Sequence, residues 1–137
     1  MAEYQKYLIS REAKPITLDI MSNCSICGVI ENAQCRNHDS EVVDQIPLVV
    51  KQMPWALRNQ KISLSLSWDS EGHARFDNNL YLSECLKYMI VEAPWGKTDD
   101  IFLIQVGNQL GHALEKMVPK AFGDQSSNIN QADLKKV

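Results

Sequence analysis

The chain has 137 residues, of which 45% are hydrophobic and 23% are charged, and its formal net charge at pH 7 is −3. This length and this hydrophobic fraction suffice for one domain with a buried core. The excess of 17 acidic over 14 basic side chains argues against a strong grip on nucleic acid, which usually requires a basic face. We find no segment typical of a secretion signal or of a membrane span. We therefore expect a cytoplasmic location, or assembly into a particle formed in the cytoplasm.

The first 14 residues mix aromatic, aliphatic and charged side chains. They predict a short helix or an irregular arm that ends at Pro15. Apolar and polar side chains then alternate from Ile16 to Ile20, which predicts a strand. This strand leads directly into residues 23–39, a segment that is rich in potential metal ligands.

Two pairs of potential ligands lie in this segment, Cys24 with Cys27 and Cys35 with His38. The members of each pair are three positions apart, and seven residues separate the pairs. Thiolate and imidazole groups bind tetrahedral structural Zn²⁺, and four protein ligands leave no position for a reactive water. The sequence therefore predicts a structural zinc site. Asp39 is expected to accept the second ring N–H of His38.

Three other interpretations of these residues are free buried thiols, a disulfide between Cys24 and Cys27, and an iron–sulfur cluster. Free thiols would not require the second pair, and no βαβ pattern of a redox protein surrounds the first pair. An iron–sulfur cluster usually has four Cys ligands, and Cys85 is the only other one. Zinc is favoured, although the choice between zinc and iron stays open. Gly28 is expected to adopt a positive φ that closes the first turn.

The middle of the chain predicts short elements. Ser40 is expected to cap a short helix over residues 42–46, which Pro47 interrupts. Residues 48–50 are ambiguous between a strand and a buried helical turn. From Ile62 to Trp68, four large apolar residues alternate with three serines, which predicts a half-buried strand. A turn over residues 69–72 and a returning strand over residues 73–76 would complete a hairpin.

Two helices are predicted in the C-terminal half. The first, about Leu80 to Glu92, is apolar almost all round and begins at residues 77–79, which are good caps. The second, about Asp100 to Val118, carries Gly107 and Gly111 beside its core stripe. Either the helix ends or kinks at these glycines, or another backbone crosses closely there. From residue 123 onward the polar tail is expected to be disordered unless a partner orders it.

These elements predict an α+β fold in which a small antiparallel sheet packs against a C-terminal helical hairpin, with the zinc loop near the N-terminus. Residues 1–122 would form a single zinc-stabilised domain, and residues 123–137 the tail.

No catalytic constellation is recognisable. The Gly96-Lys97-Thr98 sequence lacks the preceding strand and the first glycine of a phosphate-binding loop. His73 and His112 are expected to be solvated, and Cys85 to be a core residue. The His-x-Glu and Pro-Cys-x-x-Cys signature of zinc deaminases is absent. We therefore expect that the protein is not an enzyme.

The favoured function is a zinc-stabilised interaction module, acting as a small structural subunit or assembly factor of a larger complex such as a phage tail or baseplate. Its protein-binding surface is predicted on the two C-terminal helices, at Tyr81, Tyr88, Val91, Gly107 and Gly111. The alternative is a zinc-dependent nucleic-acid-binding regulator, with phosphate contacts from Arg36, Lys51, Arg58, Lys61 and Arg75. A metalloenzyme in which water displaces His38 is the least favoured hypothesis.

Overall fold

The structure, a computed structural model, describes residues 3–9 and 11–122. In chain order the elements are η1 (Glu3–Tyr7), β1 (Lys14–Met21), β2 (Val42–Val50), α1 (Trp55–Ser65), β3 (Leu66–Trp68), β4 (Ala74–Phe76), α2 (Asn78–Met89), β5 (Ile90–Glu92), α3 (Asp100–Leu103) and α4 (Asn108–Met117). The small antiparallel sheet and the helices confirm the predicted α+β class.

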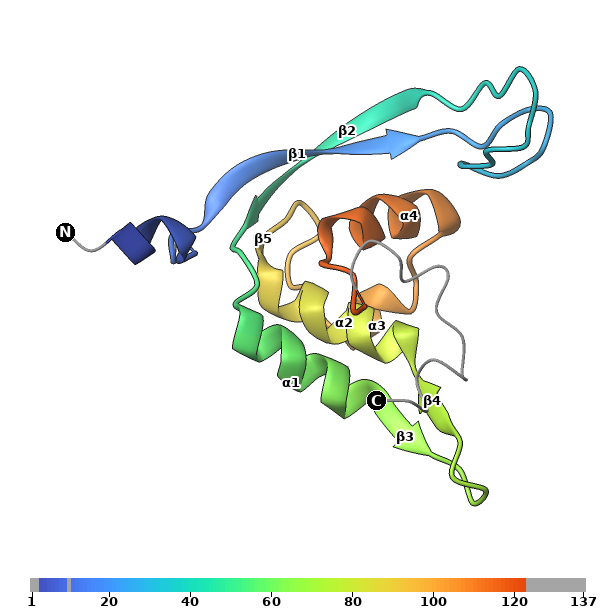
Figure 1. The fold of residues 1–137 in the computed structure, drawn as a ribbon. Coiled ribbons are helices and arrows are strands. Elements are labelled where there is room, and N and C mark those ends of the chain that lie inside the picture. Colours follow the sequence, from blue (N-terminus) through green and yellow to red (C-terminus); the bar gives the residue numbers. More distant parts are fainter. Residues whose placement is uncertain (1–2, 10, 123–137) are drawn as a thin grey trace.

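A long antiparallel ribbon of β1 and β2 dominates the shape of the molecule (Figure 1). Its register runs from Lys14 opposite Val50 to Ile20 opposite Asp44, and β5 adds a short third strand beside the inner end of β2. The ribbon extends past the helices, and the loop between its strands lies at the outer end (Figure 1). The predicted strand from residue 16 to residue 20 is therefore confirmed, and it positions the cysteine-rich loop.

The core lies where one face of the ribbon meets the helices. Side chains of β1 alternate between buried and exposed, as expected for a strand with one solvated face. Helix α1 packs beside α2, and α4 packs against β1. The buried core comprises Leu18, Ile20, Leu48, Met53, Tyr81, Cys85, Leu86, Met89, Ile90, Ala113, Leu114 and Val118.

Two residues on the outer edge of β2, Pro47 and Gln45, have no backbone N–H free to pair with a further strand. The register passes through Pro47 without a shift, opposite Thr17. Proline has no N–H, so its nitrogen must face away from β1. Gln45 lies two residues earlier and faces the same way, and its N–H donates to Asp44 Oδ1 at 2.8 Å. Neither position therefore offers a free donor to an additional strand.

Two of the predicted elements in the middle of the chain are wrong. Residues 42–46 belong to β2 and not to a short helix, and the segment from Ile62 to Ser65 is the last turn of α1 and not a strand. The inward face of α1 combines apolar Leu57 and Ile62 with polar residues, so the helical period is weak in the hydrophobic pattern. The polar residues on this face are Arg58, Lys61 and Ser65. The hairpin itself is confirmed, because β3 pairs with β4.

The predicted C-terminal helices are present but divided. The first ends at Met89, and Ile90–Glu92 form β5. The second is interrupted after α3, and Gly107 is the N-cap of α4. A Cβ at Gly107 would meet nothing within 4 Å, and one at Gly111 would meet only Val106 Cγ1 at 3.5 Å. Gly107 therefore marks a helix end, whereas Gly111 lies inside α4, and the predicted close crossing of another backbone is wrong at both glycines. The predicted polar tail lies outside the described residues.

Candidate metal centre

The four predicted ligands come together at the outer end of the ribbon. One ligand atom from each of Cys24, Cys27, Cys35 and His38 lies within 4.8 Å of the other three. The Sγ atoms of Cys24 and Cys35 are 3.9 Å apart, and Cys27 Sγ is 3.5 Å from His38 Nδ1. One metal ion at the centre of this cluster could be bound by all four side chains.

Tight turns bring the members of each pair together. In the first turn Gly28 N–H donates to Cys24 O, and Cys24 N–H donates to Val29 O, both at 2.9 Å. Gly28 has φ 78°, which confirms the expected positive φ. In the second turn Asn37 has φ 59°, a conformation that Asn tolerates better than most residues. Each turn thus places a residue suited to left-handed backbone next to its second ligand.

The imidazole of His38 is oriented by a backbone carbonyl. Its Nε2 lies 2.6 Å from the oxygen of Ile30, whose side chain is buried. A carbonyl oxygen only accepts, so Nε2 carries the proton, and Nδ1 presents a lone pair to the cluster. The prediction that Asp39 accepts this N–H is wrong. The true acceptor is a backbone atom, which side-chain identity could not reveal.

Asp39 instead joins the two ligand turns. Its Oδ1 accepts from Ser25 N–H at 2.6 Å, and its Oδ2 accepts from the Ser25 hydroxyl. These hydrogen bonds lower the pKa of Asp39 to about 2. Because Ser25 belongs to the first turn and Asp39 follows the second, the contact holds the two pairs of ligands in register. The role of Ser25 was missed, since a serine in a loop gives no specific signal.

The thiols have strongly different acidities. Burial alone would raise the pKa of Cys24. Hydrogen bonds from the backbone N–H groups of Cys27, Asp39 and Ile26 outweigh this effect and lower the pKa from its ordinary value to about 7. Burial and the neighbouring thiols of Cys27 and Cys24 raise the pKa of Cys35 to about 12. Three clustered sulfurs repel one another when ionised, so a cation is needed before all three can act as thiolates. The donor set thus favours a soft metal ion.

A charged contact connects the loop to the body. Glu31, between the two ligand pairs, forms an ion pair with Lys116 and a hydrogen bond with His112, the latter at 3.3 Å. Gln109 Nε2 also donates to Met21 O at 3.1 Å, where β1 enters the loop. Helix α4 therefore fixes the direction in which the loop extends. His112, expected to be solvated, is instead a partner of Glu31.

The residues predicted as an interaction surface lie on α2, β5 and α4, and they differ in exposure. Tyr81 is 1% exposed, and its hydroxyl donates to Pro119 O at 2.6 Å, so its assignment to a surface is wrong. Tyr88 is half-buried under Lys51, whose Nζ lies 4.1 Å from the ring centroid. Val91 is exposed on β5, whereas Gly107 is the N-cap of α4 and Gly111 lies within that helix.

The remaining titratable candidates have structural partners. His73 Nδ1 lies 3.2 Å from Asp69 Oδ2 within the β3–β4 turn. Cys85 is fully buried in the core, as predicted, and burial raises its pKa. No helix within residues 3–9 and 11–122 is long and apolar enough to cross a membrane.

Comparison with known proteins gives no relative. No protein-family model, curated protein or solved structure matches this chain. The arguments about function below therefore start from the loop, its ligand set and the surfaces around it.

Proposed function

We propose that the protein is a non-enzymatic, zinc-stabilised interaction module, a small subunit or assembly factor of a larger complex. The observation that carries the proposal is the closed set of four ligands at the end of the β1–β2 ribbon. A metal ion bound by four side chains retains no position for substrate or water, which is typical of structural sites. The centre then stabilises a loop, and the loop makes the contact.

The separations of the ligand atoms support zinc as the ion. Tetrahedral Zn²⁺ with its usual bond lengths places two sulfurs about 3.8 Å apart, and a sulfur and a nitrogen about 3.5 Å apart. The corresponding distances here are 3.9 Å for Cys24 and Cys35, and 3.5 Å for Cys27 and His38. Thiolates with one imidazole also select zinc over harder ions. The carbonyl of Ile30 supplies the outer-shell partner that metal-bound histidines usually have.

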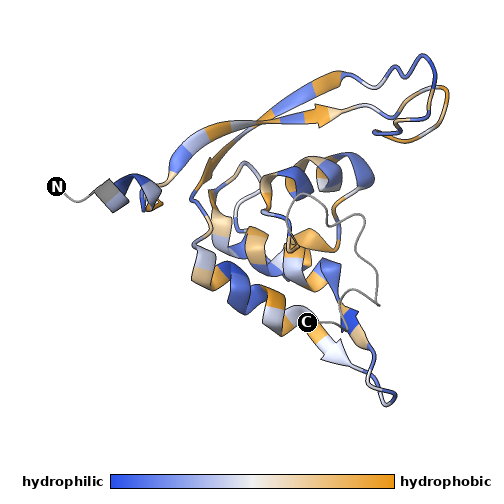
Figure 2. Cartoon of the chain, viewed as in Figure 1, coloured by the Kyte–Doolittle hydropathy of each residue, from blue (hydrophilic) through white to orange (hydrophobic). Residues whose placement is uncertain are grey.

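Exposed aliphatic side chains around the centre support a protein partner. Ile26 and Val29, in and beside the first ligand turn, are 61% and 44% exposed, and Val42 and Val43 are exposed where β2 begins. Figure 2 shows these apolar segments along the loop and the outer ribbon. A loop with so few buried residues needs the metal to stay folded, and its apolar side chains point to a partner that covers them.

The cations suggested for phosphate binding give the nucleic-acid alternative little support. Arg58 donates to the carbonyl oxygens of Lys120 and Ala121, and Lys61 pairs with Glu84 at 3.3 Å. Lys51 lies over Tyr88, and Arg75 is 3.7 Å from Asp69. Of the five, only Arg36 belongs to the metal loop. A single cation there is a poor basis for an electrostatic interface.

The test combines metal analysis with assembly of the native complex. In the double variant Ile26→Asp/Val29→Asp all four ligands remain, so we expect one zinc ion per chain and an unchanged helical circular-dichroism spectrum. Incorporation of this variant into the complex isolated from the source should be lost. Cys27→Ser should lose the zinc and the incorporation together, because the metal holds the loop in shape.

Leu64→Ser is the matched control, since it removes an exposed aliphatic side chain from α1, away from the loop. It should be incorporated as well as the wild type. Isolation of the wild-type protein from its source as a stable monomer without partners would contradict the interaction proposal. Zinc-dependent turnover of any substrate would contradict the non-enzymatic one.

A further inference from the structure

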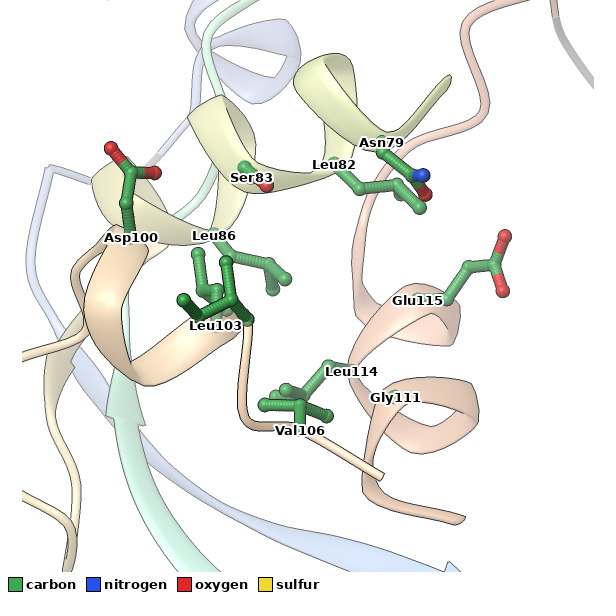
Figure 3. A pocket seen from close by; sticks show the side chains of 11 residues that line it. Asn79, Leu82, Ser83, Leu86, Asp100, Leu103, Val106, Gly111, Leu114 and Glu115 are labelled. Carbon is green, nitrogen blue, oxygen red and sulfur yellow. The ribbon is translucent and has the colours of Figure 1, made fainter. Parts of the chain in front are cut away.

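An apolar pocket of about 360 Å³ opens between α2, α3 and α4 (Figure 3). Aliphatic side chains line it from all three sides: Leu82, Leu86, Leu103, Val106 and Leu114. Ile104, the C-cap of α3, also lines the pocket and is 83% exposed, and Ile101 on α3 is 70% exposed. This volume is at the lower end of the range of about 300–1,000 Å³ for binding pockets, so it suits a few side chains.

Two carboxylates flank the opening of this pocket. Asp100 lies on one side and Glu115 on the other (Figure 3). Asp100 is paired with Lys87 at 3.1 Å. Within the described part of the chain, the Glu115 carboxylate has no hydrogen bond or ion pair. An occupant that combines apolar side chains with a positive charge would therefore match the pocket.

The segment at η1 has these properties. Tyr4, Tyr7 and Leu8 are 60%, 78% and 63% exposed. Because η1 is a 3₁₀ helix with about three residues per turn, Tyr4 and Tyr7 lie on the same side of it, and Leu8 directly follows its last residue. Lys6 and Arg11, both exposed, add positive charge. Figure 1 shows η1 beyond the start of β1 and outside the body formed by the helices.

We propose that η1 of one copy of the chain binds the pocket between α2, α3 and α4 of a second copy. The exposed aromatic and aliphatic side chains of η1 would enter the pocket, and Lys6 or Arg11 would approach Glu115. The proposal goes beyond the function proposed for the metal loop, because it concerns another surface, another partner and no metal. Because η1 and the pocket are different surfaces, each copy can bind one neighbour through η1 and another through its pocket, which produces a ring or a filament. If two copies instead insert η1 into each other's pockets, a closed dimer forms.

Sedimentation of the full-length protein across a dilution series tests this proposal. We expect concentration-dependent self-association. Tyr7→Ser/Leu8→Ser, at the last residue of η1 and the one after it, and Ile104→Asp at the pocket should each weaken it at least about tenfold, since each removes apolar burial from the contact. All three side chains are exposed in the single chain, so the variants should keep the fold and the metal content.

Mixing the two variants separates this contact from a symmetric one. The Ile104→Asp chain keeps an intact η1 and the Tyr7→Ser/Leu8→Ser chain keeps an intact pocket, so the mixture should form a one-to-one complex. Leu64→Ser, an exposed change outside both surfaces, should associate like the wild type.

A wild-type protein that stays monomeric at all concentrations would overturn the proposal, whether η1 then folds onto its own pocket or another protein fills it. Unchanged association in either variant, or no complex in the mixture, would overturn it as well. None of these results depends on the metal loop, so they leave the Ile26→Asp/Val29→Asp test unaffected.

Discussion

The Nε2 atom of His38 lies 2.6 Å from the carbonyl oxygen of Ile30. This contact couples ligand geometry to the fold of the loop, because Ile30 is one of its few buried side chains and lies between the two ligand pairs. The carbonyl fixes the proton on Nε2 and so leaves Nδ1 as the donor atom. The buried isoleucine and the metal-binding nitrogen therefore stabilise the same conformation.

Replacing His38 tests whether the metal holds the loop. His38→Ala removes one of four ligands, and we expect zinc affinity to fall by more than the roughly 10- to 100-fold typical of losing an outer-shell partner. His38→Cys should retain zinc, because four thiolates also form a structural site. Competition with a chromogenic chelator measures the affinities, and amide hydrogen exchange reports the folding of residues 22–41.

His73→Ala is the control, since His73 belongs to the distant β3–β4 turn. Equal zinc affinity in His38→Ala and His73→Ala would show that His38 is not a ligand. If a chelator unfolded the helices together with the loop, the metal would stabilise the whole domain and not the loop specifically.

The ligand set could be predicted because it depends on covalent spacing. Four side chains within 15 residues, in two pairs, can reach one ion whatever the rest of the fold does. The partners that orient them could not be predicted in the same way. Ile30 contributes a backbone oxygen, and Asp39 turns to Ser25 and not to the adjacent His38. Such choices depend on the path of the loop, which spacing alone does not determine.

The error at α1 has a different cause. Apolar residues alternate with serines over residues 62–68, but the helix that begins after Pro54 continues to Ser65. The Ser65 side chain is buried, and its hydroxyl donates to Lys61 O at 2.8 Å. Leu64, by contrast, is exposed. The burial of Ser65 and the exposure of Leu64 therefore follow the helix and not the short period-two pattern.

The hydroxyl of Tyr81 provides a test of the core. In Tyr81→Phe the carbonyl of Pro119 loses its donor at 2.6 Å, and we expect unfolding to become easier by about 1–3 kcal/mol. Burial raises the pKa of Tyr81 to about 12, above its ordinary value of about 10. The neutral phenol therefore stabilises the fold fully below about pH 10, and this contribution disappears as the pH rises towards 12. Urea unfolding at several alkaline pH values measures both effects.

Tyr88→Phe is the matched variant, because Tyr88 is half-buried on the same helix and its ring stays under Lys51 after the change. It should alter the free energy of unfolding by much less. Identical losses in the two variants would contradict a specific role for the bond from Tyr81 to Pro119.

Glu84 connects three helices through charge. It lies 2.6 Å from Lys87 and 3.3 Å from Lys61, and Lys87 also reaches Asp100 on α3. We expect Glu84→Gln to destabilise the fold by about 1 kcal/mol at neutral pH, because the pairs are partly exposed. The hydrogen bond from Lys87 lowers the pKa of Glu84, so its stabilisation is present above the ordinary value of about 4.3 and is lost as the pH falls below it.

Thermal unfolding of the wild type and Glu84→Gln between acidic and neutral pH measures this difference. The two curves should converge in acid and run in parallel near neutrality. The hydrogen bonds from Glu84 and Asp100 raise the pKa of Lys87, so its own contribution should persist until strongly alkaline pH. A difference that grew in acid would contradict the assigned charge state.

The outer edge of β2 gives the last prediction. Pro47 has no N–H and the N–H of Gln45 is bonded to Asp44 Oδ1, so this edge is closed to another strand at both positions. The double variant Asp44→Ala/Pro47→Val restores two outward donors, and we expect it to aggregate through edge-to-edge pairing with little change in the thermal midpoint. Light scattering and infrared absorption of intermolecular sheet measure this. Asp19→Ala, which removes the acceptor of Gln45 Nε2 on the partner strand, leaves both outward positions as they are and should stay dispersed. If the double variant also stayed dispersed, Pro47 and Asp44 would not be what protects this edge.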